Sequence, residues 1–216
     1  LEELHIAGEK CAALRVPQTV ITVAGETEQK ERISDALLTA RAGQDIVYAG
    51  WAGLEGMLRI IGEKEAELRE RFTPAFIGQM KAYDSELCGL SKIAVADAMG
   101  VSVIRQVSRG GILASLWDLA KDTELGLNLD LKKIAVRQET IEVCEHFRLN
   151  PYQLASGGSF LMLTENGEAL ADALNQKGIQ AAVIGQLTDS NDKVIHNGED
   201  MRYIDRPAPD ELMKVF

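Results

Sequence analysis

The sequence has few of the residues on which metal and disulfide sites depend. It contains three cysteines and three histidines in 216 residues, and Cys11, Cys88 and Cys144 form no CxxC pair. A scattered, odd set of thiols is typical of a protein in a reducing cytoplasm, with its thiols buried. Cys144 and His146 are two positions apart on a predicted helix, so their side chains point in different directions. We therefore expect no metal site in this sequence.

Basic charge and long apolar runs are also scarce. The formal net charge is −10, which disfavours nucleic acid and anionic membranes as partners. No apolar run approaches the roughly 20 residues that span a bilayer, and no basic segment precedes an apolar one as in a secretory leader. A small anionic ligand remains compatible with this charge, because a pocket can be built from backbone N–H groups.

Several catalytic signatures are missing as well. The sequence has no GxxxxGK[ST], HExxH or GxSxG, and its glycines do not form GxGxxG between a strand and a helix. His5, His146 and His196 stand apart from any acidic pattern. We interpret each of the three as a surface or structural residue.

What is present is an alternation of apolar strand-like and amphipathic helix-like segments. The 46% hydrophobic content predicts a packed core. Several strands are short and amphipathic, which favours an α/β sandwich with a mixed sheet and helices packed on it over a doubly wound fold. Within the helix at 138–147 we expect Ile141, Cys144 and Phe147 to face inward, and we expect the tail with Pro207 and Pro209 to be a surface end. The predicted strands are 18–26, 45–49, 101–106, 125–131, 160–163, 181–187 and a hairpin of 193–196 with 201–204; the predicted helices are 54–71, 74–87, 90–99, 112–120, 138–147 and 167–177.

The segment VSVIRQVSRGG predicts a strand that turns through a glycine pair into a helix. Ser108 is the candidate N-cap. The paired Gly110 and Gly111 would let the backbone approach a ligand, and the helix start would offer free N–H groups to phosphate. Arg105 and Arg109 could add charge-assisted hydrogen bonds. The alternative is a tight turn with two surface arginines.

Two further glycine-rich segments carry the same ambiguity. The stretch 154–159, LASGGS, could form an anion-binding nest around Gly157 and Gly158, or a plain turn that needs positive φ. The stretch 50–56, GWAGLEG, reads as a strand-to-helix turn. There Glu55 could contact a ligand or metal, although a solvated first-turn glutamate is the simpler interpretation. Trp51 is expected to pack rather than to stack on a ligand.

In order and spacing, these segments resemble the AIR synthase-related (PurM-like) superfamily, and most of all its HypE-like branch of hydrogenase maturation proteins. AGQDIVYAGWAGLEG is similar to that branch's GDxIxxxGxxGxxG, and QVSRGG to its D-[AV]-[TS]-x-GG. EVCEHFRLNPYQLASGGS is similar to ExC..FGLxP followed by A-N-E-G, and AAVIGQLTDSN to the closing AxxIGxV. The resemblance implies a C-terminal AIR synthase-like domain over 41–206, a remnant of the N-terminal ATP-binding domain and connector over 1–40, and a tail over 207–216. Since the chain starts at Leu1 within such a remnant, we expect it to be the C-terminal part of a longer protein.

The resemblance also implies a function. The full-length protein would use ATP and Mg²⁺ to phosphorylate, and so activate, an amide or carboxamide oxygen, with a maturation-protein partner and a homodimeric assembly. Three departures motivate an alternative, a non-catalytic nucleotide-sensing or assembly module. Gln106 stands where the family has an aspartate, Gly157 where it has a glutamate, and the terminal cysteine of the branch is missing. No residue is assigned a catalytic role; the expected nucleotide- and phosphate-binding residues are Arg105, Ser108, Arg109, Gly110, Gly111, Gly157 and Gly158.

Overall fold

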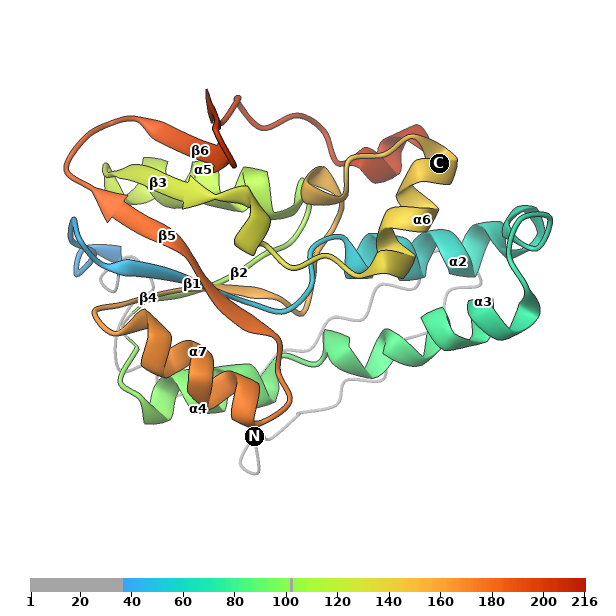
Figure 1. Cartoon of the computed structure of the whole chain (residues 1–216), viewed down its shortest axis with the longest axis horizontal. Helices are drawn as coiled ribbons and strands as arrows, with labels where there is room; N and C mark the ends of the chain where they lie inside the picture. The colour runs from blue at the N-terminus through green and yellow to red at the C-terminus, as the bar shows by residue number, and fades with distance from the viewer. Residues whose placement is uncertain (1–36, 102) are drawn as a thin grey trace, which may run out of the picture.

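The fold is built on one mixed β-sheet (Figure 1). The computed structural model describes residues 37–101 and 103–216. Seven strands pair in the order β2-β4-β1-β5-β3-β6-β7, and every pairing is antiparallel except β3 with β6. The strands are β1 (Asp45–Ala49), β2 (Val103–Gln106), β3 (Gly126–Asp130), β4 (Phe160–Thr164), β5 (Ala181–Thr188), β6 (Lys193–Asn197) and β7 (Asp200–Tyr203).

The middle of the sheet is apolar on both faces. The strand β1 reads DIVYA and β4 reads FLMLT, and nearly all of their residues are buried. Because side chains alternate across a strand, Ile46 and Tyr48 enter one core while Val47 and Ala49 enter the other. A strand that is buried on both faces of the sheet therefore requires an uninterrupted apolar run.

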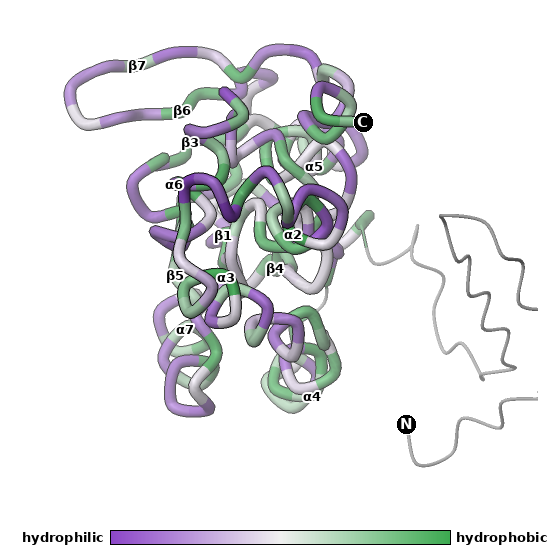
Figure 2. The backbone as a smooth tube through the Cα atoms, turned by 90° about the vertical axis from the view of Figure 1, so that its right-hand side faces the viewer, coloured by the Kyte–Doolittle hydropathy of each residue, from purple (hydrophilic) through white to green (hydrophobic). Residues whose placement is uncertain are grey.

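Helices cover the two faces unequally (Figure 1). The helix α5 (Gly111–Thr123) packs on one face through Ile112, Leu116 and Leu119. The helices α4 (Leu90–Ala98) and α7 (Gly167–Gln176) pack on the opposite face. The hairpin of β6 and β7 extends away from these layers (Figure 2), and every residue of β7 is exposed.

A third core lies beyond the end of the sheet. It is formed by α2 (Leu54–Leu68), α3 (Pro74–Lys81) and α6 (Gln138–Phe147). Four short 3₁₀ segments connect the elements or end the chain, and the last one contributes Leu212 to this core. They are η1 (Ala82–Leu87), η2 (Leu131–Lys133), η3 (Pro151–Gln153) and η4 (Glu211–Lys214).

Most of the predicted elements are confirmed, including the mixed sheet and the closing hairpin. The strand predicted over 18–26 lies outside the described residues. The predicted inner face of α6 was wrong in part, since its buried residues are Thr140, Val143 and Cys144. The prediction of a surface tail holds for Pro207 and Pro209, which are exposed, but is wrong for Glu211 and Leu212, which are only 5% and 6% exposed. No helix within the described ranges has the length and apolar character needed to cross a membrane.

Candidate functional site: a junction of three glycine-rich turns

The three glycine-rich segments meet at one end of the sheet. We call this the glycine junction and define it as residues 50–56, 107–111 and 154–159. Because β4 runs antiparallel to both β1 and β2, the turn before β4 lies beside the turns that follow β1 and β2. Backbone hydrogen bonds connect them: Gly56 N donates to Ala155 O at 2.9 Å, and Val107 N donates to Ser159 O at 2.9 Å. The sequence predicts each turn separately, but only the pairing of β4 with β1 and β2 shows that the three turns lie together.

Buried hydroxyls hold the junction from the inside. Ser156 Oγ accepts from Gly53 N at 2.8 Å and donates to Leu154 O at 2.7 Å. Ser159 Oγ donates to Ser156 O at 2.6 Å and accepts from the Tyr48 hydroxyl at 3.1 Å. Burial raises the pKa of Tyr48, with the Ser159 hydrogen bond opposing it, so the phenol stays a neutral donor. A fully paired polar network of this kind fixes the turn geometry.

Gly157 is held by Glu55, a residue for which sequence reasoning favoured a solvated role. Gly157 N donates to Glu55 Oε2 at 2.8 Å, and Arg59 lies 3.8 Å from the other carboxylate oxygen. A Cβ built on Gly157 would lie 2.6 Å from Glu55 Oε2. The glutamate that the family resemblance expects at 157 would therefore displace Glu55. In this chain, a carboxylate reaches the turn from α2 instead.

The start of α5 already binds an anionic group, which is the carboxylate of Asp210 from the same chain. Gly110 N donates to Asp210 Oδ2 at 2.7 Å, and Gly111 N donates to Ser108 O at 3.2 Å. The N-cap is Gly110 and not Ser108, so the predicted serine cap is wrong. Gly110 has φ 77°, a conformation that a serine adopts only at a cost. The helix start thus attracts a carboxylate, as its dipole predicts.

The remaining predicted residues divide into two groups. Arg105 Nη1 lies 2.6 Å from Asp122 Oδ2 on α5, so the charge of Arg105 is paired within the domain. Gly158 has φ 81° and packs so tightly against Leu87 that a Cβ would lie 2.4 Å from the Leu87 carbonyl oxygen. Ser108 and Arg109 are exposed, and neither side chain has a partner among the described residues. Ser108 and Arg109 are therefore free side-chain donors of the junction.

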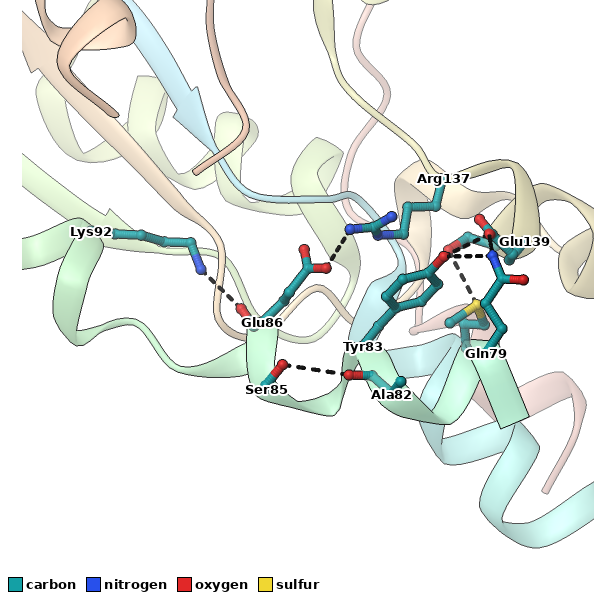
Figure 3. A network of polar contacts seen from close by, with 10 residues as sticks. Gln79, Ala82, Tyr83, Ser85, Glu86, Lys92, Arg137 and Glu139 are labelled. Atoms are coloured by element: carbon teal, nitrogen blue, oxygen red, sulfur yellow. Dashed lines mark hydrogen bonds and ion pairs between the residues drawn. The ribbon is translucent and has the colours of Figure 1, made fainter. Parts of the chain in front are cut away.

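An arginine that the sequence reasoning missed, Arg137, supports the first turn of the junction through Trp51. Figure 3 shows Arg137 beside Tyr83 and Glu86. The Arg137 guanidinium lies 4.2 Å from the Trp51 ring centroid and 3.8 Å from that of Tyr83, and it forms an ion pair with Glu86. The Tyr83 hydroxyl donates to Glu139 Oε1 at 2.7 Å. Trp51 therefore packs inside the protein, as predicted. Arg137 follows no motif, and only the fold brings these rings to it.

The described residues offer little to a metal ion. They contain no group of three or more His, Cys, Asp or Glu side chains placed to hold one. Mg²⁺ is bound mainly through carboxylates, waters and substrate phosphates. The described part of this chain therefore does not by itself fit the Mg²⁺ that the resemblance implies, and we derive no step through that ion.

Comparison with known proteins identifies the family. The model of the AIR synthase related protein, C-terminal domain, matches residues 41–197. The chain belongs to this family. Its AIR synthase-related membership confirms the resemblance and the fold class inferred from the sequence. The match includes all three segments of the glycine junction.

Several relatives of this chain are named as hydrogenase maturation proteins. Carbamoyl dehydratase HypE of Rhizobium leguminosarum bv. viciae is 26% identical over 153 residues, which cover 68% of this chain and 41% of the relative. A putative hydrogenase expression/formation protein of Methanocaldococcus jannaschii is 23% identical over 217 residues, covering 97% of this chain and 62% of that one. The chain therefore spans about half the length of the curated relatives it matches.

Solved structures show the same fold. E. coli HypE, a hydrogenase maturation protein, superposes with a TM-score of 0.65 at 21% identity, over 83% of this chain and 54% of that chain. HypE in complex with ATP gives 0.59 at 18% identity, over 82% and 54%. The HypE–HypF complex gives 0.59 at 22% identity, over 79% and 55%. At these identities the likeness establishes the fold alone.

Proposed function

We propose that this chain is the C-terminal part of a HypE-like, ATP-dependent maturation protein that activates an amide or carboxamide oxygen by phosphorylation. The observation that carries the proposal is the glycine junction, because three segments of one family-matched domain converge at the same end of the sheet. The curated relative from R. leguminosarum is named a carbamoyl dehydratase, and a similar structure holds ATP. The first supports a carboxamide as the group that is activated, and the second supports a nucleotide as the ligand.

In this proposal the junction acts on phosphate through donors rather than through a carboxylate. The Arg109 guanidinium is exposed and free to bind phosphate oxygens in a bidentate manner. The Ser108 hydroxyl lies next to it and adds a neutral donor. Gly110, Gly111, Gly157 and Gly158 keep the backbone close and fixed, while Arg105 orients α5. ATP supplies the phosphoryl group, and this domain positions it and balances its charge.

Several features of the full assembly belong to the same proposal. We infer that Mg²⁺ is held mainly by residues outside the described part of this chain. A homodimer, a maturation-protein partner and a cytoplasmic location complete it. The HypE–HypF complex supports the partner, and the scattered thiols support the reducing compartment.

The test is Mg²⁺-ATP binding by the full-length gene product, followed by calorimetry. Arg109→Gln should weaken binding about tenfold, since one charge-assisted contact is worth roughly 1.5–3 kcal/mol before solvent screening. Lys177→Gln, an exposed charge at the end of α7, is the matched control and should leave the affinity unchanged. Absence of ATP binding, or equal affinity in Arg109→Gln, would overturn the proposal.

A further inference from the structure

A polar pocket lies beside the glycine junction, between α5, η3 and the β6–β7 hairpin. It encloses about 230 Å³, which is room for a small oxyanion with several waters, because a water takes about 30 Å³ in the liquid. Its lining includes Gly110, Asn150 and Gln153 from the start of α5 and from η3 and the residue before it. It also includes Arg202 of β7 and Arg206, which follows the hairpin. We call these five residues the donor pocket.

The arginines of the donor pocket have no carboxylate of their own. Neither Arg202 nor Arg206 forms an ion pair within the described ranges, although seven other arginines and lysines of this acidic protein do. Burial raises the pKa of Tyr152, and the nearby charge of Arg202 opposes that rise, so the Arg202 guanidinium lies close to η3. Asp205 also lines the pocket and leaves the lining with a net charge of +1.

The side-chain amide acceptors of Asn150 and Gln153 are already used, while donors remain. Asn150 Oδ1 accepts from Tyr152 N at 3.0 Å, and Gln153 Oε1 accepts from Asn150 Nδ2 at 3.2 Å. The Gln153 amide nitrogen has no acceptor in the described part of the chain. Gly110 N is satisfied by Asp210 at the rim. Free donors from separate elements, with amide acceptors used, suit a ligand that only accepts hydrogen bonds.

We propose that the donor pocket binds a small oxyanion, a phosphate or carboxylate group, through Arg202, Arg206 and Gln153. This site shares Gly110 with the glycine junction but uses other donors than the proposed nucleotide surface, where Ser108 and Arg109 are free. Because both arginines are exposed, binding is screened by salt. The two sites adjoin at Gly110, so an anion here bears on the start of α5.

The test titrates the full chain with inorganic phosphate, and separately with acetate, by calorimetry at an ionic strength held constant with chloride. The double variant Arg202→Gln/Arg206→Gln should weaken oxyanion binding at least tenfold. The control, Lys121→Gln/Lys177→Gln, removes two exposed charges elsewhere and should stay within twofold of the parent. The ratio of phosphate to acetate affinity distinguishes the two ligand sources.

Gln153→Glu provides a second variant of nearly the same shape, in which a carboxylate repels the ligand and binding should again fall at least tenfold. Circular dichroism verifies that each variant is folded. The proposal is overturned if the parent binds neither anion at millimolar concentration, or if the double variant binds as tightly as the parent. Mg²⁺-ATP affinity of the full-length gene product should be unaffected by Arg202→Gln/Arg206→Gln, which separates this site from the proposed nucleotide surface.

Discussion

Replacing Gly111 with alanine measures how closely the start of α5 approaches η3. Gly111 has φ 67°, and a Cβ there would lie 2.4 Å from Tyr152 O and 2.8 Å from Leu154 O. Both contacts are to backbone oxygens, so no side-chain rotation relieves them. Left-handed φ costs an alanine about 1–2 kcal/mol, and forcing atoms into a packed site adds about 1–3 kcal/mol. The sum predicts a loss of about 2–5 kcal/mol in the free energy of unfolding.

Gly100→Ala separates these two costs. Gly100 has φ 69°, nearly the same conformation, but nothing lies within 4 Å of its would-be Cβ. This variant should lose only the conformational cost of about 1–2 kcal/mol. Gly62→Ala serves as a control of opposite sign. Gly62 lies within α2 with open space around it, so alanine should stabilise the protein by about 1 kcal/mol.

Urea unfolding followed by circular dichroism measures all three variants, and a shift in midpoint at constant slope reports stability. Gly111→Ala should be the least stable by about 1–3 kcal/mol relative to Gly100→Ala, the contribution of the clash. If the two variants unfold at the same midpoint, the close approach of α5 to η3 is not a constraint, and the glycine pair serves only the turn.

Three further predictions address the supports of the junction. Asp210→Ala should destabilise the protein by about 1–2 kcal/mol in urea unfolding, because Gly110 N loses its charged acceptor; Asp210→Asn should lose less, and an unchanged midpoint in Asp210→Asn would exclude a role for the charge. Burial, and then the charge of Glu211, raises the pKa of Cys144 to about 12. The unfolded chain therefore loses this proton first above pH 9, so stability should fall between about pH 9 and 12, and Cys144→Ala should flatten that slope. Arg137→Lys should cost about 1–2 kcal/mol by urea unfolding, since an ammonium cannot replace a planar guanidinium between Trp51 and Tyr83; an unchanged midpoint would refute the stacking argument.

The sequence predicted the sheet well because its signals are local. The buried strands β1 and β4 are continuous apolar runs between turn residues, and the paired glycines before α5 predicted a strand-to-helix turn. The inner face of α6 was missed in part because its apolar residues lie on more than one side. There, packing against α2 and the tail decides that Thr140 and Val143 are buried.

The residues of the candidate site likewise differ in whether local sequence patterns could predict their roles. Sequence patterns indicated Arg105, Ser108 and Arg109 as equivalent donors, but strand pairing and the length of α5 bring Arg105 to Asp122 and leave the other two exposed. Arg137 belongs to no motif, and its partners Trp51 and Tyr83 come from segments more than 50 positions away in the chain. No local pattern could have identified such a residue.

The N-cap of α5 shows why a local rule selected the wrong residue. Serine is a good cap because its side chain accepts from the first turn, and Ser108 stands at a plausible spacing. The glycine pair, however, takes the chain through two left-handed residues, Gly110 and Gly111. Asp210, 100 positions away, accepts from Gly110 N in place of Ser108 and leaves the Ser108 side chain exposed. Because Asp210 in the tail satisfies the N–H group at the start of α5, the Ser108 hydroxyl is available to bind a ligand. Ser108 therefore remains in the proposed function although it does not cap the helix.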